Sequence, residues 1–141
     1  MANRELSVSS RLRDQRDFQW ENRVVLVTED EEMNFFYLKT LLSKANAQVI
    51  RARNGQEAVD IMMQESGKID LILMDLNMPV MDGYEAMRII KTRFPHIPII
   101  AQTAYTLNND RNKCIDAGFN DYISKPISRS VLYRLVNDNL S

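Results

Sequence analysis

The sequence of 141 residues contains a single cysteine, Cys114, so it cannot form a disulfide within the chain. The lack of structural disulfides is typical of proteins in a reducing compartment, and the cytoplasm is the simplest such location. A reactive thiol is the alternative role for Cys114. We do not expect that role, because no histidine lies near Cys114 in the sequence and its neighbours form no nucleophile motif.

Long apolar runs and an excess of one charge are also lacking. No uninterrupted apolar stretch is long enough to span a bilayer and no secretory signal is visible, so we expect no membrane segment in this chain. The 18 Lys and Arg residues nearly balance the 19 Asp and Glu residues. This balance gives no general reason to expect direct nucleic-acid binding.

Histidine is equally scarce, since His96 is the only one in the chain. It is flanked by Pro95 and Pro98, a pattern that indicates a loop before a strand rather than an exposed helix face. We therefore expect His96 neither to donate a phosphoryl group nor to bind a metal.

The length suits one domain preceded by a short extension. Residues 1–22 are rich in charged side chains and have few apolar ones, which predicts an N-terminal extension or linker. From residue 23 to residue 141, apolar runs alternate with amphipathic stretches. The runs predicted as strands are 24–28, 48–52, 70–74, 98–102 and 121–124. Strands that alternate with helices predict a parallel (βα)5 sheet with helices on both faces.

Charged side chains stand where three of these strands end. Asp75 ends the apolar run LILMD, Glu29 and Asp30 follow VVLV, and Lys125 follows the last strand. A buried carboxylate needs a charged partner or a metal, and ligands of open α/β sheets bind at the carboxyl ends of the strands. Carboxylate oxygens favour Mg²⁺. The spacing therefore predicts one site, suited to metal-assisted phosphoryl transfer to Asp75.

Each of these residues also has a simpler interpretation. Glu29 and Asp30 could begin the next helix, where acids are common, and Asp75 could be a helix cap. Against the cap, Asn77-Met78-Pro79 disfavours an immediate helix. Lys125 could be a solvated surface lysine, and Thr103 at the end of the fourth strand could be an ordinary strand residue.

Four motifs at successive strand ends, TEDEE, MDLNMPVMDG, QTA and SKP, resemble the receiver domain of two-component response regulators over about residues 23–141. The resemblance implies a flavodoxin-like doubly wound sheet with strand order 2-1-3-4-5. It implies that Asp75 is the phosphoacceptor and that Mg²⁺ is held by Glu29, Asp30, Asp75 and the backbone carbonyl of Asn77.

The same resemblance implies roles for residues around the acceptor. Lys125, before a cis Pro126, would pair with Asp75 and then with its phosphoryl group. Thr103, the Ala104 backbone amide and the Tyr122 ring would form the switch. The side chains of Asn77 and Tyr105, each two positions after a motif residue, would tune the lifetime of the phosphoryl group.

The resemblance further implies a phosphorelay protein that takes its phosphoryl group from a histidine kinase or a histidine phosphotransfer protein, and that is not a turnover enzyme. The segment NDRNKCIDAGFNDYISKPI is most like receivers of hybrid sensor histidine kinases, and a stand-alone regulator is the alternative.

Two further classes of protein remain open. One is an aspartyl phosphohydrolase, although Asn77 stands where such enzymes have a second acid. The other is a degenerate binding module, although Asp30, Asp75, Thr103 and Lys125 are all present.

The motifs depart from the receiver pattern in two mild ways. Glu29 takes a place often held by Asp, and Glu31 adds an acid beside it. The extra negative charge could tighten Mg²⁺ binding or hinder an anionic phosphodonor.

Overall fold

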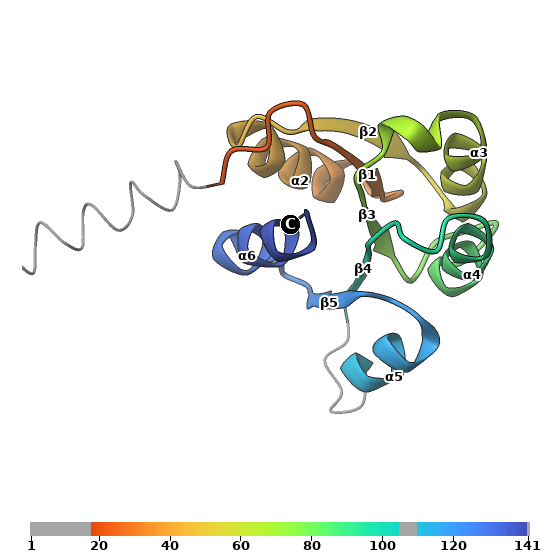
Figure 1. The fold of residues 1–141 in the computed structure, drawn as a ribbon. Helices are drawn as coiled ribbons and strands as arrows, with labels where there is room; N and C mark the ends of the chain where they lie inside the picture. Colours follow the sequence, from red (N-terminus) through yellow and green to blue (C-terminus); the bar gives the residue numbers. More distant parts are fainter. Residues whose placement is uncertain (1–17, 105–109, 141) are drawn as a thin grey trace, which may run out of the picture.

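A computed structural model describes residues 18–104 and 110–140 of the chain. All strand pairs are parallel, and the sheet has the order β2-β1-β3-β4-β5, as predicted (Figure 1). The strands are β1 (Val24–Thr28), β2 (Gln48–Ala52), β3 (Leu71–Asp75), β4 (Ile99–Thr103) and β5 (Asp121–Ser124). The sheet therefore brings the carboxyl ends of β1, β3 and β4 to one edge.

Helices connect the strands and close the chain. They are α2 (Glu32–Lys44), α3 (Gly55–Glu65), α4 (Gly83–Arg93), α5 (Asp110–Ala117) and α6 (Arg129–Leu140), with a 3₁₀ turn η1 (Ser66–Lys68) before β3. In Figure 1, α2 and α6 lie on one side of the sheet and α3 and α4 on the other. The predicted alternation of strands and helices on both faces is confirmed. None of the helices in 18–104 and 110–140 is both long and apolar enough to cross a bilayer.

Two strands begin and end one residue later than predicted. β3 starts at Leu71, and just before it the Asp70 side chain accepts a hydrogen bond from the Val24 backbone amide, at 2.8 Å. β4 starts at Ile99 and ends at Thr103, which pairs with Ser124 of β5.

Two apolar clusters cover the two faces of the sheet. Leu26, Ile72 and Ile99 point into a core with α3 and α4, whereas Val27 and Leu73 point into a core with α2 and α6. All five residues of β3 are buried. A central strand of a parallel sheet is buried on both faces, so it forms a continuous apolar run, and here that run ends in the carboxylate of Asp75.

Side-chain caps start two of the helices. Asn54 accepts a hydrogen bond from the Glu57 amide and Asp82 accepts one from the Glu85 amide, both at 2.9 Å. At α4 the cap is followed by Gly83, where a Cβ atom would run into the backbone carbonyl oxygen of Asp75. The start of α4 therefore lies directly against the end of β3.

The segment before β1 packs on the domain. Trp20 is buried, its ring stands edge-on to Tyr133 of α6, and its indole Nε1 donates to Asn137 Oδ1 at 3.2 Å. Its backbone amide donates to the carbonyl of Ala45 at 2.8 Å. The contacts join residues before β1 to the ends of α2 and α6, while the predicted division between residues 22 and 23 stays a prediction.

Candidate functional site

Three carboxylates from the ends of neighbouring strands meet at one edge of the sheet. Glu29 and Asp30 follow β1, and Asp75 ends the adjacent β3. A ligand oxygen from each lies within 4.8 Å of the other two. Glu29 and Asp75 are only 1% and 3% exposed, whereas Asp30 is exposed. The predicted gathering of these acids is therefore present in the structure.

Lys125 is the cation that faces the buried acids. Its Nζ lies 3.0 Å from Asp75 Oδ2 and 3.2 Å from Glu29 Oε1. The peptide bond from Lys125 to Pro126 is cis, and the Lys125 amide donates to the carbonyl of Thr103 at 2.8 Å. Lys125 is thus an ion-pair partner of Asp75 and not a solvated surface lysine.

The protonation state of Lys125 follows from these contacts. Burial lowers the pKa of Lys125, but the hydrogen bond and charge of Asp75, together with Glu29, outweigh it. The net effect is a pKa above the ordinary value of 10.5. The ammonium therefore stays charged at neutral pH.

Backbone and amide donors orient the two buried carboxylates. Asp75 Oδ1 accepts a hydrogen bond from the backbone amide of Asn77 at 3.0 Å. Glu29 Oε2 accepts one from the amide of Glu31 at 3.2 Å, and Glu29 Oε1 accepts one from the Asn34 side chain. Asp75 is thus held from the loop after β3, and Glu29 is held from the loop after β1 and from α2.

The site meets the chemical demands of a magnesium ion. The ammonium of Lys125 pairs with the two buried acids, and Asp30 adds a third carboxylate nearby, so carboxylates outnumber the ammonium in this cluster. All three offer the hard oxygen ligands that Mg²⁺ prefers. The backbone carbonyl of Asn77 stays a predicted ligand.

The predicted switch residues lie next to the acids in the sheet. Thr103 is buried at the end of β4, and exposed Ala104 follows it. Tyr122 of β5 is in register with Ala101, and its ring packs partly buried against the core with α3 and α4. Tyr105, the predicted lifetime residue, lies outside the described residues.

Two side chains that the motifs did not point to also act on the site. Asn34 contacts Glu29 from the first turns of α2, and Arg51 of β2 reaches the backbone of the same loop. An asparagine on a helix and an arginine in a strand give no sequence signal of such a role, because both contacts depend on how α2 and β2 pack beside β1.

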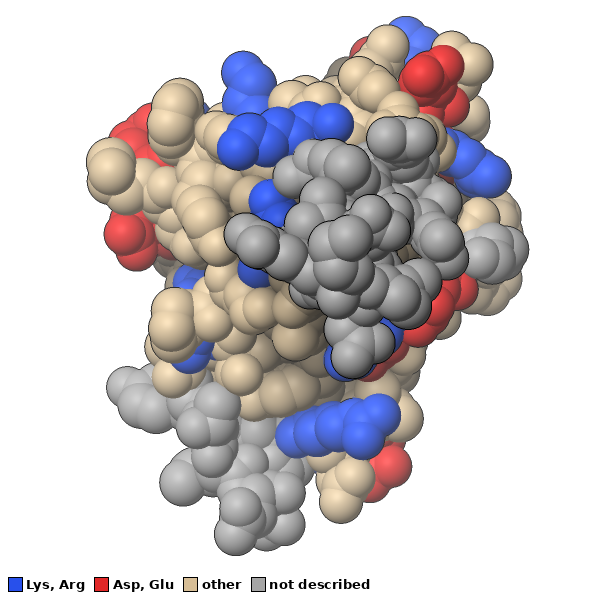
Figure 2. Space-filling model, turned by 90° about the vertical axis from the view of Figure 1, so that its left-hand side faces the viewer, with Lys and Arg blue, Asp and Glu red and all other residues tan. Residues whose placement is uncertain are grey.

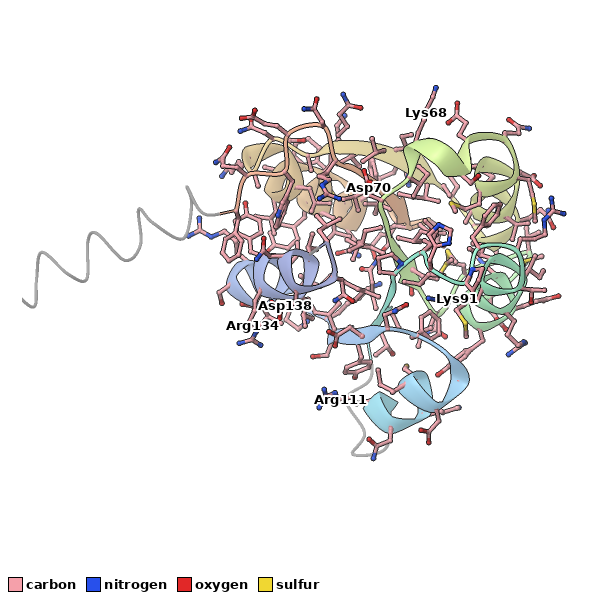
Figure 3. The ribbon with its side chains drawn as sticks, viewed as in Figure 1. Lys68, Asp70, Lys91, Arg111, Arg134 and Asp138 are labelled. Carbon is pink, nitrogen blue, oxygen red and sulfur yellow. The ribbon has the colours of Figure 1, made fainter. Side chains whose placement is uncertain are left out.

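His96 and Cys114 lie away from the site. His96 is exposed in the loop before β4, at the amino-terminal edge of the sheet, where Asp70 and Lys91 are also found (Figure 3). Cys114 is fully buried on α5, and its Sγ lies 3.6 Å from the Tyr84 hydroxyl. Neither residue is within the cluster of acids.

Comparison with known proteins gives the family. Residues 25–137 match the model of the response regulator receiver domain. Hybrid signal transduction histidine kinase I of Dictyostelium discoideum is 38% identical over 82% of this chain but only 7% of its own length. The polar-differentiation response regulator DivK of Brucella anthropi is 38% identical over 74% of this chain and 85% of its own. The chain thus spans a small part of the hybrid kinase and most of DivK.

Solved structures agree. The receiver domain of a Pseudomonas aeruginosa sensor histidine kinase, with a magnesium ion in its active site cleft, is 35% identical at a TM-score of 0.76, covering 84% of this chain and 97% of that one. A Saccharomyces cerevisiae receiver domain, crystallised with a histidine phosphotransfer protein, is 31% identical at a TM-score of 0.72, covering 82% and 87%. This chain belongs to the response regulator receiver domain family of two-component signalling.

Proposed function

We propose that this domain takes a phosphoryl group from a phosphohistidine onto Asp75, with Mg²⁺ held by Glu29, Asp30, Asp75 and the carbonyl of Asn77. The observation that supports this most is the ion pair of Lys125 with Asp75, in which Lys125 Nζ lies 3.0 Å from Asp75 Oδ2 and 3.2 Å from buried Glu29. A nucleophilic carboxylate, a cation and a set of metal ligands are the groups that phosphoryl transfer requires.

Asp75 and Lys125 have different roles at the reacting atoms, as nucleophile and as cation. A carboxylate oxygen of Asp75 attacks phosphorus in line with the departing histidine nitrogen, and the P–N bond breaks as the P–O bond forms. Lys125, already beside Asp75, pairs with an oxygen of the transferred group. Bound Mg²⁺ would neutralise further charge on that group. The Asn77 amide holds Asp75 Oδ1, which limits rotation of the nucleophile.

The output is proposed to be a change in protein contacts rather than turnover of a substrate. Thr103 and the Ala104 amide would hydrogen-bond the new phosphoryl oxygens, and Tyr122 would move with Thr103. Phosphorylation would then favour one arrangement of the face formed by α5, β5 and α6.

The side chains of Asn77 and Tyr105 are proposed to set how long the acyl phosphate survives, and a Tyr105→Ala variant should lose the phosphoryl group faster.

The partner that delivers the phosphoryl group is proposed to be a histidine kinase or a histidine phosphotransfer protein. Beside the acids, the first turns of α2 expose Met33 and Phe36, which are 74% and 65% exposed. Large exposed apolar side chains next to a reactive group suit a protein partner that covers them. The 18 Lys and Arg residues nearly balance the 19 Asp and Glu residues, and both signs are present on the face shown in Figure 2, so we propose no nucleic-acid partner.

The parent protein is proposed to be a hybrid sensor histidine kinase, with residues 1–22 as an extension or linker before the receiver. The similarity to hybrid kinase receivers supports this proposal. A single-domain regulator is the second candidate, because DivK is equally identical over most of its own length.

Beryllium trifluoride, a tetrahedral mimic of a phosphoryl group, tests the acceptor site without a partner. We expect a bound signal in ¹⁹F nuclear magnetic resonance of the full chain that requires Mg²⁺. The signal should vanish in Asp75→Ala, which removes the carboxylate, and persist in Asp70→Ala, whose carboxylate lies before β3 at the opposite edge. A signal that is unchanged in Asp75→Ala would contradict the proposal.

A further inference from the structure

Arg51 of the edge strand β2 donates two hydrogen bonds to the loop that carries Glu29 and Asp30. Its Nε donates to the carbonyl oxygen of Glu29 at 3.1 Å, and its Nη2 donates to the carbonyl oxygen of Asp30 at 3.3 Å. The Arg51 side chain is only 13% exposed. One guanidinium therefore holds two consecutive peptide groups of the loop between β1 and α2.

The guanidinium is itself fixed from α2. Its Nη1 lies 2.9 Å from Glu32 Oε1, and its central carbon lies 4.5 Å from the centre of the Phe35 ring. The helix α2 has no side-chain hydrogen bond from its N-cap residue Glu31, unlike α3 and α4. Contacts from Arg51 hold the start of α2 and the preceding loop in place of such a cap.

We propose that Arg51 is a positioning residue for the metal site, holding the backbone of Glu29 and Asp30 so that their carboxylates are preorganised for Mg²⁺. The proposal rests on the proposed function, since it assumes that these acids bind the ion. Mg²⁺ demands near-ideal octahedral geometry, so its affinity depends on how well the ligands are held. Residues that orient metal ligands are commonly worth about 10- to 100-fold in affinity.

The charge of Arg51 acts in the opposite direction from its contacts. A cation beside the acids repels Mg²⁺, although Glu32 offsets part of that charge. Hydrogen bonds from Arg51 and Arg53 hold the pKa of Glu32 below its usual value, so Glu32 is ionised at neutral pH. Loss of the Arg51 charge alone would therefore tighten Mg²⁺ binding, whereas loss of its two hydrogen bonds to the loop would weaken Mg²⁺ binding.

Lysine cannot replace the paired hydrogen bonds of Arg51 to the carbonyls of Glu29 and Asp30. The two N–H groups that reach the loop lie on different nitrogens along one edge of a rigid planar guanidinium, whereas all three N–H groups of an ammonium lie on one nitrogen and cannot reproduce that spacing. Arg51→Lys keeps the charge and the apolar stem but loses the paired contact. Arg51→Met keeps the stem against Phe35 and loses both.

Arg53 is the matched control. Its Nη1 also lies 2.9 Å from Glu32 Oε1, but its side chain is 59% exposed. In the part of the chain that the structure describes, its guanidinium forms an ion pair with Glu32 and no hydrogen bond with the carbonyls of Glu29 or Asp30. Arg53→Lys therefore makes the same Arg-to-Lys change beside Glu32 without removing a hydrogen bond to the loop.

Isothermal titration of Mg²⁺ into the full chain tests the proposal. We expect the dissociation constant to rise about tenfold in Arg51→Lys. It should rise by a smaller factor in Arg51→Met, because loss of the repelling charge offsets part of the effect, and change less than about twofold in Arg53→Lys. Thermal unfolding without Mg²⁺ checks that each variant is folded, and either Arg51 variant is sufficient.

Two results would overturn the proposal: wild-type affinity in Arg51→Lys, or tighter Mg²⁺ binding in Arg51→Met. A wild-type chain that binds no Mg²⁺ would instead contradict the proposed function, because it would show that the acids are not a metal site.

Discussion

At the scale of single residues, the site depends on one lysine between two buried acids. Lys125 is within 3.2 Å of both Glu29 and Asp75, and no second ammonium or guanidinium of the described residues is paired with either carboxylate. Removal of one partner of such a group leaves the other charges uncompensated, and this is more costly than loss of an exposed ion pair. The charge of Lys125 should therefore contribute to stability as well as to phosphoryl transfer.

The pH dependence of Lys125→Met tests this contribution. The pKa of Lys125 is raised in the folded chain above 10.5. Its stabilising charge is thus fully present below that value and is lost as the pH rises through the folded-state pKa. We expect Lys125→Met to unfold at a lower temperature than the wild type, by a constant margin between about pH 7 and pH 9, and the margin to shrink above about pH 10.5.

Calorimetry without Mg²⁺ at each pH would measure that margin. Lys39→Met is the control, because Lys39 lies on the exposed surface of α2 and should give a small margin at every pH. A margin for Lys125→Met that grows with pH would contradict the assignment of the ammonium as the stabilising partner.

At the scale of elements, the start of α4 is pressed against the end of β3. A Cβ on Gly83 would meet backbone atoms of Asp75, whereas one on Gly67 of η1 would meet nothing within 4 Å. We expect Gly83→Ala to lower the free energy of unfolding by about 1 to 3 kcal/mol, the usual cost of overpacking. Gly67→Ala should change it by less than about 1 kcal/mol. Urea unfolding of the two variants measures both changes, and equal losses of unfolding free energy would argue against the close approach of Gly83 to the Asp75 backbone.

The contact between the segment before β1 and α6 is a second test at this scale. Trp20→Ala removes a buried indole that packs on Tyr133, and we expect a loss of about 3 kcal/mol in the free energy of unfolding. Phe36→Ala removes an exposed ring from α2, and its effect should stay within about 0.5 kcal/mol. A small effect of Trp20→Ala in urea unfolding would show that the segment does not contribute to the fold.

At the scale of the whole molecule, apolar runs predicted the sheet because its three central strands, β1, β3 and β4, are short and mostly apolar. The acids were predictable for the same reason, since Glu29 and Asp75 directly follow or end such runs. The hydrogen bonds from Arg51 to the loop after β1 were not predictable, because they depend on the register of β2 beside β1 and on the packing of α2 over both. The burial of Trp20 was also missed, because the surrounding residues 1–22 carry few other apolar side chains.

The central claim is that Asp75 accepts a phosphoryl group with Mg²⁺. The most direct test is to incubate the purified chain with acetyl phosphate, with and without Mg²⁺, and to measure the intact mass of the wild type and of Asp75→Asn. We predict a single Mg²⁺-dependent phosphoryl adduct on the wild type and none on the variant. No adduct on the wild type, or steady release of phosphate from many unrelated esters, would contradict the account.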